Sequence, residues 1–323
     1  MRSGTAFVFA VAMSWMLPVT AQAADASGCS LKRAASIDML PEAQGLALVQ
    51  VDINGTKFPL IVDTGGILSS LSQEAVHKLN LSPRLGDEAE IQVNGKKMTG
   101  TVNVASFGIG DMHGSNFEFV VDPNAFLGSV ASGRLSPDLL RGFDVDFDFA
   151  ANKFNLFSPD HCEGKVVYWT TNYTQMPITL DRMGHIVTRI ELDGVTLDAV
   201  IDTGSARSTI SEEIANRAYH INENTPGIEH IPDAQPDDVL QYRYRFKTLS
   251  MNGITVKSPI MVILPDLAEQ QMKTDLGKLA SDPQYGMSAP PPRVIIGMDV
   301  LRQLHIYIAY KESMIYASPA SAH

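Results

Sequence analysis

Two stretches of the chain carry the same pattern of apolar and polar positions. Residues 45–74 alternate apolar and polar side chains toward an Asn-Gly turn, and a second apolar run then enters an Asp-Thr-Gly turn at Asp63. Residues 184–213 repeat the pattern around an Asp-Gly turn and enter a second Asp-Thr-Gly turn at Asp202. Asn-Gly and Asp-Gly between apolar runs are strong signals for a β-hairpin. The pattern predicts two related hairpins, each leading into an Asp-Thr-Gly turn.

The two stretches align without a gap, at a constant offset of 139 positions. Glycine and polar positions recur along the whole alignment. They are Gly45 with Gly184, Gly55 with Gly194, Ser69 with Ser208, Ser72 with Ser211, and Glu74 with Glu213. One Asp-Thr-Gly tripeptide is a weak motif. Two copies inside a gapless repeat indicate that the two halves of the chain share a structure.

A later apolar segment closes each half of the chain. Short helical turns are expected over residues 139–143 and 300–304, each before a final strand. Short strands with Gly-rich turns favour an all-β fold with minor helix. We expect two lobes, an N-terminal one over residues 24–163 and a C-terminal one over residues 164–323.

The first 23 residues have the features of a signal peptide. Arg2 gives a positive start, residues 5–17 form an apolar core, Pro18 breaks it, and residues 21–23 make a small-x-small cleavage site. Thirteen residues are too few to span about 30 Å of hydrocarbon as a helix, which disfavours a membrane anchor. We expect export, to a bacterial periplasm, and no membrane span in the mature chain.

Composition narrows the choice of partners and raises the question of a disulfide. The net charge is −11, and no run of Lys and Arg suggests a nucleic-acid partner. Cys29 and Cys162 are the only cysteines, and an oxidising compartment favours a bridge between them. Two free buried thiols are the alternative. Metal ligation is disfavoured because His161, beside Cys162, has no further ligands at a recognisable spacing.

The two aspartates can be explained chemically if the halves pack about a two-fold axis. A buried carboxylate must be hydrogen-bonded, paired or protonated. Two-fold packing would bring Asp63 face to face with Asp202, so that the two carboxyl groups form such a pair. Two carboxyl groups about 3 Å apart share one proton. A water held between them can be activated by general acid–base catalysis.

The residues after each aspartate suit supporting roles. The hydroxyl groups of Thr64 and Thr203 can each bond the backbone of the opposite loop. Gly65 and Gly204 allow backbone N–H groups to approach the carboxylates closely.

With these residues the chain resembles the aspartic peptidases, in particular bacterial exported relatives of retropepsin fused into a two-lobed, pepsin-like chain. The resemblance rests on the two Asp-Thr-Gly turns, Ser205 after the second, and residues 294–297. It implies the pepsin/retropepsin-type fold of two β-barrel-like lobes, protein or peptide substrates, no cofactor and no metal. It also implies a flap over residues 90–104, with Asn94, Gly95, Lys96 and Lys97 at its tip.

The sequence departs from that family at Gly66, where pepsin-like members carry Ser or Thr; Ser205 fits the pattern. A hydroxyl group bonded to a carboxylate favours its ionised form. We therefore expect an asymmetric pair, in which Asp202 stays ionised and Asp63 holds the proton.

Other departures concern the first lobe and the flap. Arg134 stands at an apolar position beside the first catalytic loop, unless the alignment slips and Gly133 takes the role of the family glycine. The expected flap has no Tyr; Tyr242 and Tyr244 either line the cleft from the second half or mark a half-exposed strand. The alternating aspartates of residues 144–148 are expected on the solvent face of a strand, with a calcium site as the alternative.

The leading interpretation is an exported aspartic endopeptidase, which we expect to act as a monomer because one chain carries both lobes. A peptide-binding or regulatory protein without turnover on the same fold is the alternative, favoured by the altered first lobe. The roles of residues 222–238 and 266–293, two stretches rich in loop-forming residues, do not follow from the sequence.

Overall fold

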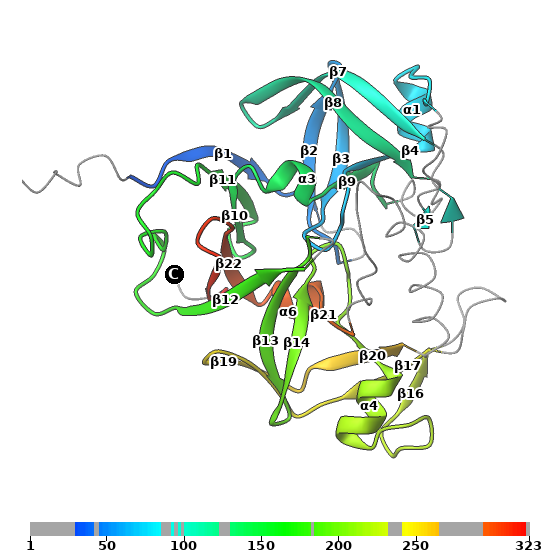
Figure 1. Cartoon of the computed structure of the whole chain (residues 1–323), viewed down its shortest axis with the longest axis vertical. Coiled ribbons are helices and arrows are strands. Elements are labelled where there is room, and N and C mark those ends of the chain that lie inside the picture. Colours follow the sequence, from blue (N-terminus) through cyan, green and yellow to red (C-terminus); the bar gives the residue numbers. More distant parts are fainter. Residues whose placement is uncertain are drawn as a thin grey trace, which may run out of the picture.

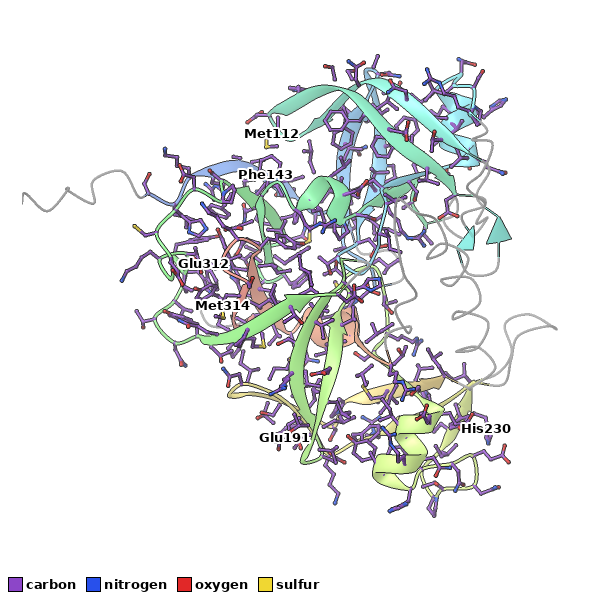
Figure 2. The ribbon with its side chains drawn as sticks, viewed as in Figure 1. Met112, Phe143, Glu191, His230, Glu312 and Met314 are labelled. Carbon is purple, nitrogen blue, oxygen red and sulfur yellow. The ribbon has the colours of Figure 1, made fainter. Side chains whose placement is uncertain are left out.

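The computed structural model describes residues 30–41, 45–84, 92–93, 96–97, 100–122, 130–181, 184–231, 241–264 and 293–320. The described chain is mostly β-structure, with an N-terminal lobe at the top of Figure 1, a C-terminal lobe at the bottom, and a sheet between them. In Figure 2, Met112 marks the first lobe, Glu191 and His230 mark the second, and Met314 lies by the intervening sheet. The expected all-β, two-lobed fold is confirmed.

The N-terminal lobe is a closed barrel of six strands, in the order β2-β3-β9-β4-β8-β7. The strands are β2 (Leu48–Ile53), β3 (Thr56–Val62), β4 (Ser70–Ser72), β7 (Thr101–Ile109), β8 (Met112–Asp122) and β9 (Gly133–Leu135). Val51, Ile53 and Leu60 are among the apolar side chains that fill it. Closing the sheet leaves no free edge in the barrel.

The C-terminal lobe repeats this strand order in a sheet that runs β13-β14-β21-β15-β20-β17-β16, with the β18–β19 hairpin joined to β13. The strands are β13 (Ile186–Leu192), β14 (Val195–Ile201), β15 (Thr209–Ser211), β16 (Glu229–Ile231), β17 (Gln241–Arg245), β18 (Thr248–Met251), β19 (Ile254–Lys257), β20 (Ile260–Leu264) and β21 (Val294–Ile296). The long β7–β8 hairpin of the first lobe is thus matched by four shorter strands.

Each half of the chain gives three strands to the sheet between the lobes. They are β1 (Arg33–Asp38), β10 (Asp144–Asp148), β11 (Lys153–Phe157), β12 (Thr174–Leu180), β22 (Leu304–Ala309) and β23 (Met314–Pro319). The halves meet where β10 pairs antiparallel with β22, Val145 opposite Ile308. This shared sheet fixes the two lobes relative to each other.

The hairpin turns have the backbone conformation that their sequences predict. Asn54 and Gly55 have φ values of 50° and 78°, and Asp193 and Gly194 have values of 45° and 84°. A two-residue turn with both central residues at positive φ matches the twist of the flanking strands. The two predicted hairpins are therefore confirmed.

Short helices follow the same order in both lobes. They are α1 (Gln73–Lys78), α3 (Pro137–Leu140), α4 (Glu212–Tyr219) and α6 (Met298–Leu301). Ser72 and Ser211 cap α1 and α4, because each hydroxyl group accepts a backbone N–H from the first turn. The helical turns expected from residues 139 and 300 are present, and each begins two residues earlier.

The prediction that the aspartates of β10 face solvent is wrong. Asp144 and Asp146 are fully buried. Asp146 contacts His305 Nε2 at 2.7 Å, and Asp144 contacts His161 Nε2 at 2.5 Å. The alternation remains, but the strand lies inside the shared sheet, where polar side chains from other segments cover it. No cluster in the described part of the chain is arranged to hold a metal ion.

Several predicted features lie outside the described residues. These are the signal peptide, Cys29, the flap tip at residues 94–95, and most of the two loop-rich stretches. Cys162 is disulfide-bonded, and its pairing with Cys29 stays a prediction. Among the described helices, none has the length and apolar character needed to cross a membrane.

Candidate active site

The two Asp-Thr-Gly turns begin where β3 and β14 end. Each strand runs parallel to a short strand from later in its own half, β3 beside β9 and β14 beside β21. The N–H group of Asp63 donates to Leu135 O at 2.9 Å, and that of Asp202 donates to Ile296 O at 3.0 Å. These equivalent bonds fix the backbone at the start of each turn.

Thr64 and Thr203 tie the turns to each other. The Thr64 hydroxyl donates to Ile201 O at 2.8 Å and accepts the Thr203 N–H at 3.1 Å. In the mirror arrangement, the Thr203 hydroxyl donates to Val62 O at 2.6 Å and accepts the Thr64 N–H at 3.1 Å. Both threonines are almost fully buried. The four bonds join the lobes directly beneath the aspartates, as the sequence predicts.

Gly65 and Gly204 are required by the close approach of the opposite carboxyl group. A Cβ added at Gly65 would lie 2.2 Å from Asp202 Cγ, and one at Gly204 would lie 2.2 Å from Asp63 Oδ1. The N–H groups of Gly65 and Gly204 also donate to their own aspartates, at 3.1 and 2.8 Å. Each carboxyl group is thus held by one loop and packed against the other.

The electrostatics of the pair are asymmetric. Burial, and next the negative charge of Asp63, raise the pKa of Asp202 to about 7, although the Gly204 N–H and the electrostatic effect of His185 oppose the rise. Asp63 is in turn ion-paired, since Arg134 Nε lies 3.3 Å from its Oδ2. A cation beside one carboxylate favours its ionised form. The arrangement therefore assigns the negative charge to Asp63 and the proton to Asp202.

The opposite assignment rests on an expected hydrogen bond from the Ser205 hydroxyl to a carboxylate, and the structure does not have that bond. The Ser205 hydroxyl donates to Arg207 O at 2.8 Å rather than to a carboxylate. In the first lobe, a Cβ at Gly66 would lie 2.5 Å from Ser136 Oγ. Ser136 aligns with Gly297, so each lobe carries one serine and one glycine at this pair of positions, but in exchanged places.

The register of the strands settles the alignment around Arg134. Arg134 pairs with Ile61 in β3, and Ile295 pairs with Val200 in β14. Arg134 therefore occupies the place of Ile295, without a slip. Gly133 has a separate role, since a Cβ there would lie 2.0 Å from the Ser70 carbonyl oxygen.

A second layer of equivalent bonds lies behind the turns. The Ser69 hydroxyl donates to Asp138 at 2.7 Å, and the Ser208 hydroxyl donates to Asp299 at 2.6 Å. Burial raises the pKa of Asp138, opposed by its bonds to Ser69. The sequence alignment paired Ser69 with Ser208 but did not reveal that aspartates bind them. The sequence marks these aspartates only by their place at the second position of α3 and of α6.

The residues predicted to bind substrate lie in two separate parts of the molecule, the expected flap and the C-terminal lobe. Lys96 lies in β6 (Lys96–Lys97), paired with β5 (Gln92–Val93), while Asn94 and Gly95 lie outside the described residues. Tyr242 is 4% exposed and its hydroxyl donates to Glu212 at 2.7 Å. Tyr244 packs on Phe246. Both tyrosines belong to the packing of the C-terminal lobe, and Tyr244 is only partly buried; whether either lines the cleft stays a prediction.

Sequence reasoning missed Asp122 and His185. Arg134 Nη1 contacts Asp122 Oδ2 at 2.6 Å, and His185 Nδ1 contacts Asp181 at 2.8 Å. No local pattern marks either residue. A cavity of about 810 Å³ is lined by residues of β12, β13, β14 and the β18–β19 hairpin and by neither member of the aspartate pair, so it is not the site of this chemistry.

Comparison with known proteins agrees with this geometry. The family model described as aspartyl protease matches residues 49–144 and 188–300, well over half of the chain, and its two parts contain one Asp-Thr-Gly turn each. A comparison with curated proteins found no significant match. On the family match and the paired turns, the chain belongs to the aspartyl protease family.

Proposed function

We propose that this protein is an exported aspartic endopeptidase, which hydrolyses peptide bonds with a water molecule activated between Asp63 and Asp202. The observation that carries the proposal is the meeting of the two carboxyl groups across the lobes, each packed against the opposite glycine. The raised pKa of Asp202 supports a pair that holds one proton near neutral pH.

The asymmetry of the pair gives each carboxyl group a role. Ionised Asp63 takes a proton from the water as its oxygen attacks the peptide carbonyl carbon, and protonated Asp202 gives its proton to the carbonyl oxygen. Asp63 then protonates the leaving nitrogen, and Asp202 takes a proton back from a hydroxyl group of the tetrahedral intermediate. The C–N bond breaks and the pair returns to its starting state.

The substrate would be an extended segment of a protein or peptide, held partly by strand-like hydrogen bonds. The two carboxyl groups supply both the acid and the base, so the mechanism requires no metal ion or organic cofactor. Both groups come from one chain, which supports action as a monomer.

Export is supported by the signal-peptide pattern over residues 1–23 and by the disulfide-bonded state of Cys162. Disulfides persist in oxidising compartments such as the bacterial periplasm. We place the mature enzyme there, with Cys29 bridged to Cys162.

Cleavage of a mixture of unfolded proteins between pH 3 and 8 tests the proposal. Asp63→Asn and Asp202→Asn should each lower the cleavage rate by roughly 10²–10⁴-fold, since each removes a general acid or base. Asp198→Asn is the matched control, because Asp198 is an exposed residue of β14, the strand that leads to Asp202. A folded wild type without cleavage at any pH would favour the peptide-binding alternative.

A further inference from the structure

Arg134 lies beside the aspartate pair in the first lobe and has no charged counterpart at the equivalent position of the second lobe. Its position in β9 corresponds to Ile295 in β21, where the side chain is apolar. The side chain of Arg134 is 19% exposed and those of Asp63 and Asp122 are 9% and 1% exposed. A charge in so buried a place must be compensated, and the two carboxylates compensate it.

The guanidinium group connects the two carboxylates by different nitrogens. Nε lies 3.3 Å from Asp63 Oδ2, and Nη1 lies 2.6 Å from Asp122 Oδ2. Because the guanidinium is planar, the contact with Asp122 on β8 fixes the orientation of the edge that faces Asp63. Arg134 is thus held in place by a residue outside the aspartate pair.

Among the described residues of the first lobe, no hydroxyl group contacts Asp63 in the way that Arg134 does. Gly66 has no side chain, and Ser136 Oγ is buried without a hydrogen-bond partner in the described part of the chain. Gly65 N–H donates to Oδ1 of Asp63, the oxygen turned toward Gly204. Arg134 is the charged group that contacts the other oxygen, Oδ2.

We propose that Arg134 is a positioning residue that keeps Asp63 ionised and so assigns the shared proton to Asp202. The inference rests on the proposed function for its consequence in catalysis, but the placement of the proton can be measured without turnover. A cation near Asp63 stabilises the singly protonated pair relative to the doubly protonated one. Activity should therefore extend to lower pH than the pair alone would allow.

The other charged groups around the pair bear on the size of the effect. His185, before β13, has an electrostatic effect on Asp202, and its Nδ1 lies 2.8 Å from Asp181 Oδ2. Asp138 from α3 lies behind the first turn, bonded to Ser69. Removing Arg134 alone would also take an ion-pair partner from the buried carboxylate of Asp122, so Asp122 is neutralised in the same variant.

The test compares Arg134→Ile/Asp122→Asn with wild type in the full mature chain. Ile is chosen because Ile295 fills the equivalent position. The acidic limb of the pH dependence of kcat/KM should move upward by roughly 1–3 pH units, the effect of an opposite charge within about 4–6 Å. Arg134→Lys keeps the positive charge, so its acidic limb should stay close to that of wild type. Ile295→Met in the other lobe should leave the limb unchanged.

The second readout is the titration of ¹³C-labelled aspartate carboxyl groups by NMR, with signals assigned from Asp63→Asn and Asp202→Asn. Arg134→Gln is a further neutral variant of similar shape, in case the isoleucine variant does not fold. An unmoved Asp63 signal in the folded neutral variants overturns the inference, whether or not the protein cleaves peptides. A shifted signal in a protein without cleavage supports the inference and counts against the proposed function instead.

Discussion

Replacing Thr203 by Val tests how much the cross-lobe network stabilises the fold. The substitution keeps the shape of the side chain and removes its hydroxyl group. Two buried backbone groups lose a partner, the carbonyl of Val62 at 2.6 Å and the N–H of Thr64 at 3.1 Å. Each buried group left without a partner costs about 1–3 kcal/mol, so the free energy of unfolding should fall by about 2–6 kcal/mol.

Thr203→Ser is the matched control. Serine keeps the hydroxyl group and loses one buried methyl group, which costs about 1 kcal/mol. The valine variant should therefore be the less stable of the two, although it is closer to threonine in volume. Thr64→Val should cost a similar amount, because Thr64 makes the equivalent bonds to Ile201 and Thr203.

The assay is urea unfolding followed by the fluorescence of Trp169, the one tryptophan outside residues 1–23. Trp169 stacks on His305 of β22 in the shared sheet, with ring centroids 3.9 Å apart, so its emission reports unfolding of that sheet. The reasoning is refuted if the valine variant is as stable as the serine variant or more stable.

Two further predictions concern the asymmetry of the lobes. Gly66→Ser places a Cβ 2.5 Å from Ser136 Oγ and 3.0 Å from Asp63 Oδ2, so overpacking should lower the free energy of unfolding by about 1–3 kcal/mol. Adding Ser136→Gly should recover much of this loss in the same urea assay. A double variant no more stable than the single one would contradict the idea that serine and glycine have exchanged places between the two lobes. Because the pKa of Asp202 is raised in the folded state, folding binds a proton between pH 3.8 and about 7, and the contribution of this group to stability falls as pH rises through that range. Asp202→Asn should therefore lose less stability than wild type from pH 4 to 8, and parallel curves would count against the raised pKa.

The parts of the fold that could be predicted are those with a local signal. The hairpins follow from two-residue turns that need positive φ at Asn54 and Gly55, and the candidate aspartates follow from a tripeptide that recurs within a long alignment. The contacts of Thr64 and Thr203 also followed, because a two-fold arrangement leaves each hydroxyl group only the opposite loop to bond. In these cases the sequence pattern and the geometry carry the same information.

The buried aspartates of β10 show where a local pattern is insufficient. Alternation of polar and apolar residues predicts that one face of a strand meets water. Asp146 instead meets His305, 159 positions later in the chain, and Tyr168, 22 positions later. The pairing of β10 with β22 brings Asp146 and His305 together, and no spacing in the sequence encodes it. A buried polar network and a solvent face therefore give the same sequence pattern.

The asymmetry of the aspartate pair arises from residues that break the repeat. Identical carboxyl groups in equivalent frames would have equal claims to the shared proton, and the threonine network is equivalent on both sides. Arg134 occupies the position equivalent to Ile295 of the other lobe and its Nε lies 3.3 Å from Asp63 Oδ2, whereas His185 is bonded to Asp181 and has the smallest of the named effects on the pKa of Asp202. The direct ion pair of Arg134 should therefore outweigh the effect of His185. The proton is then expected on Asp202, and removal of Arg134 should perturb the pair more than removal of His185.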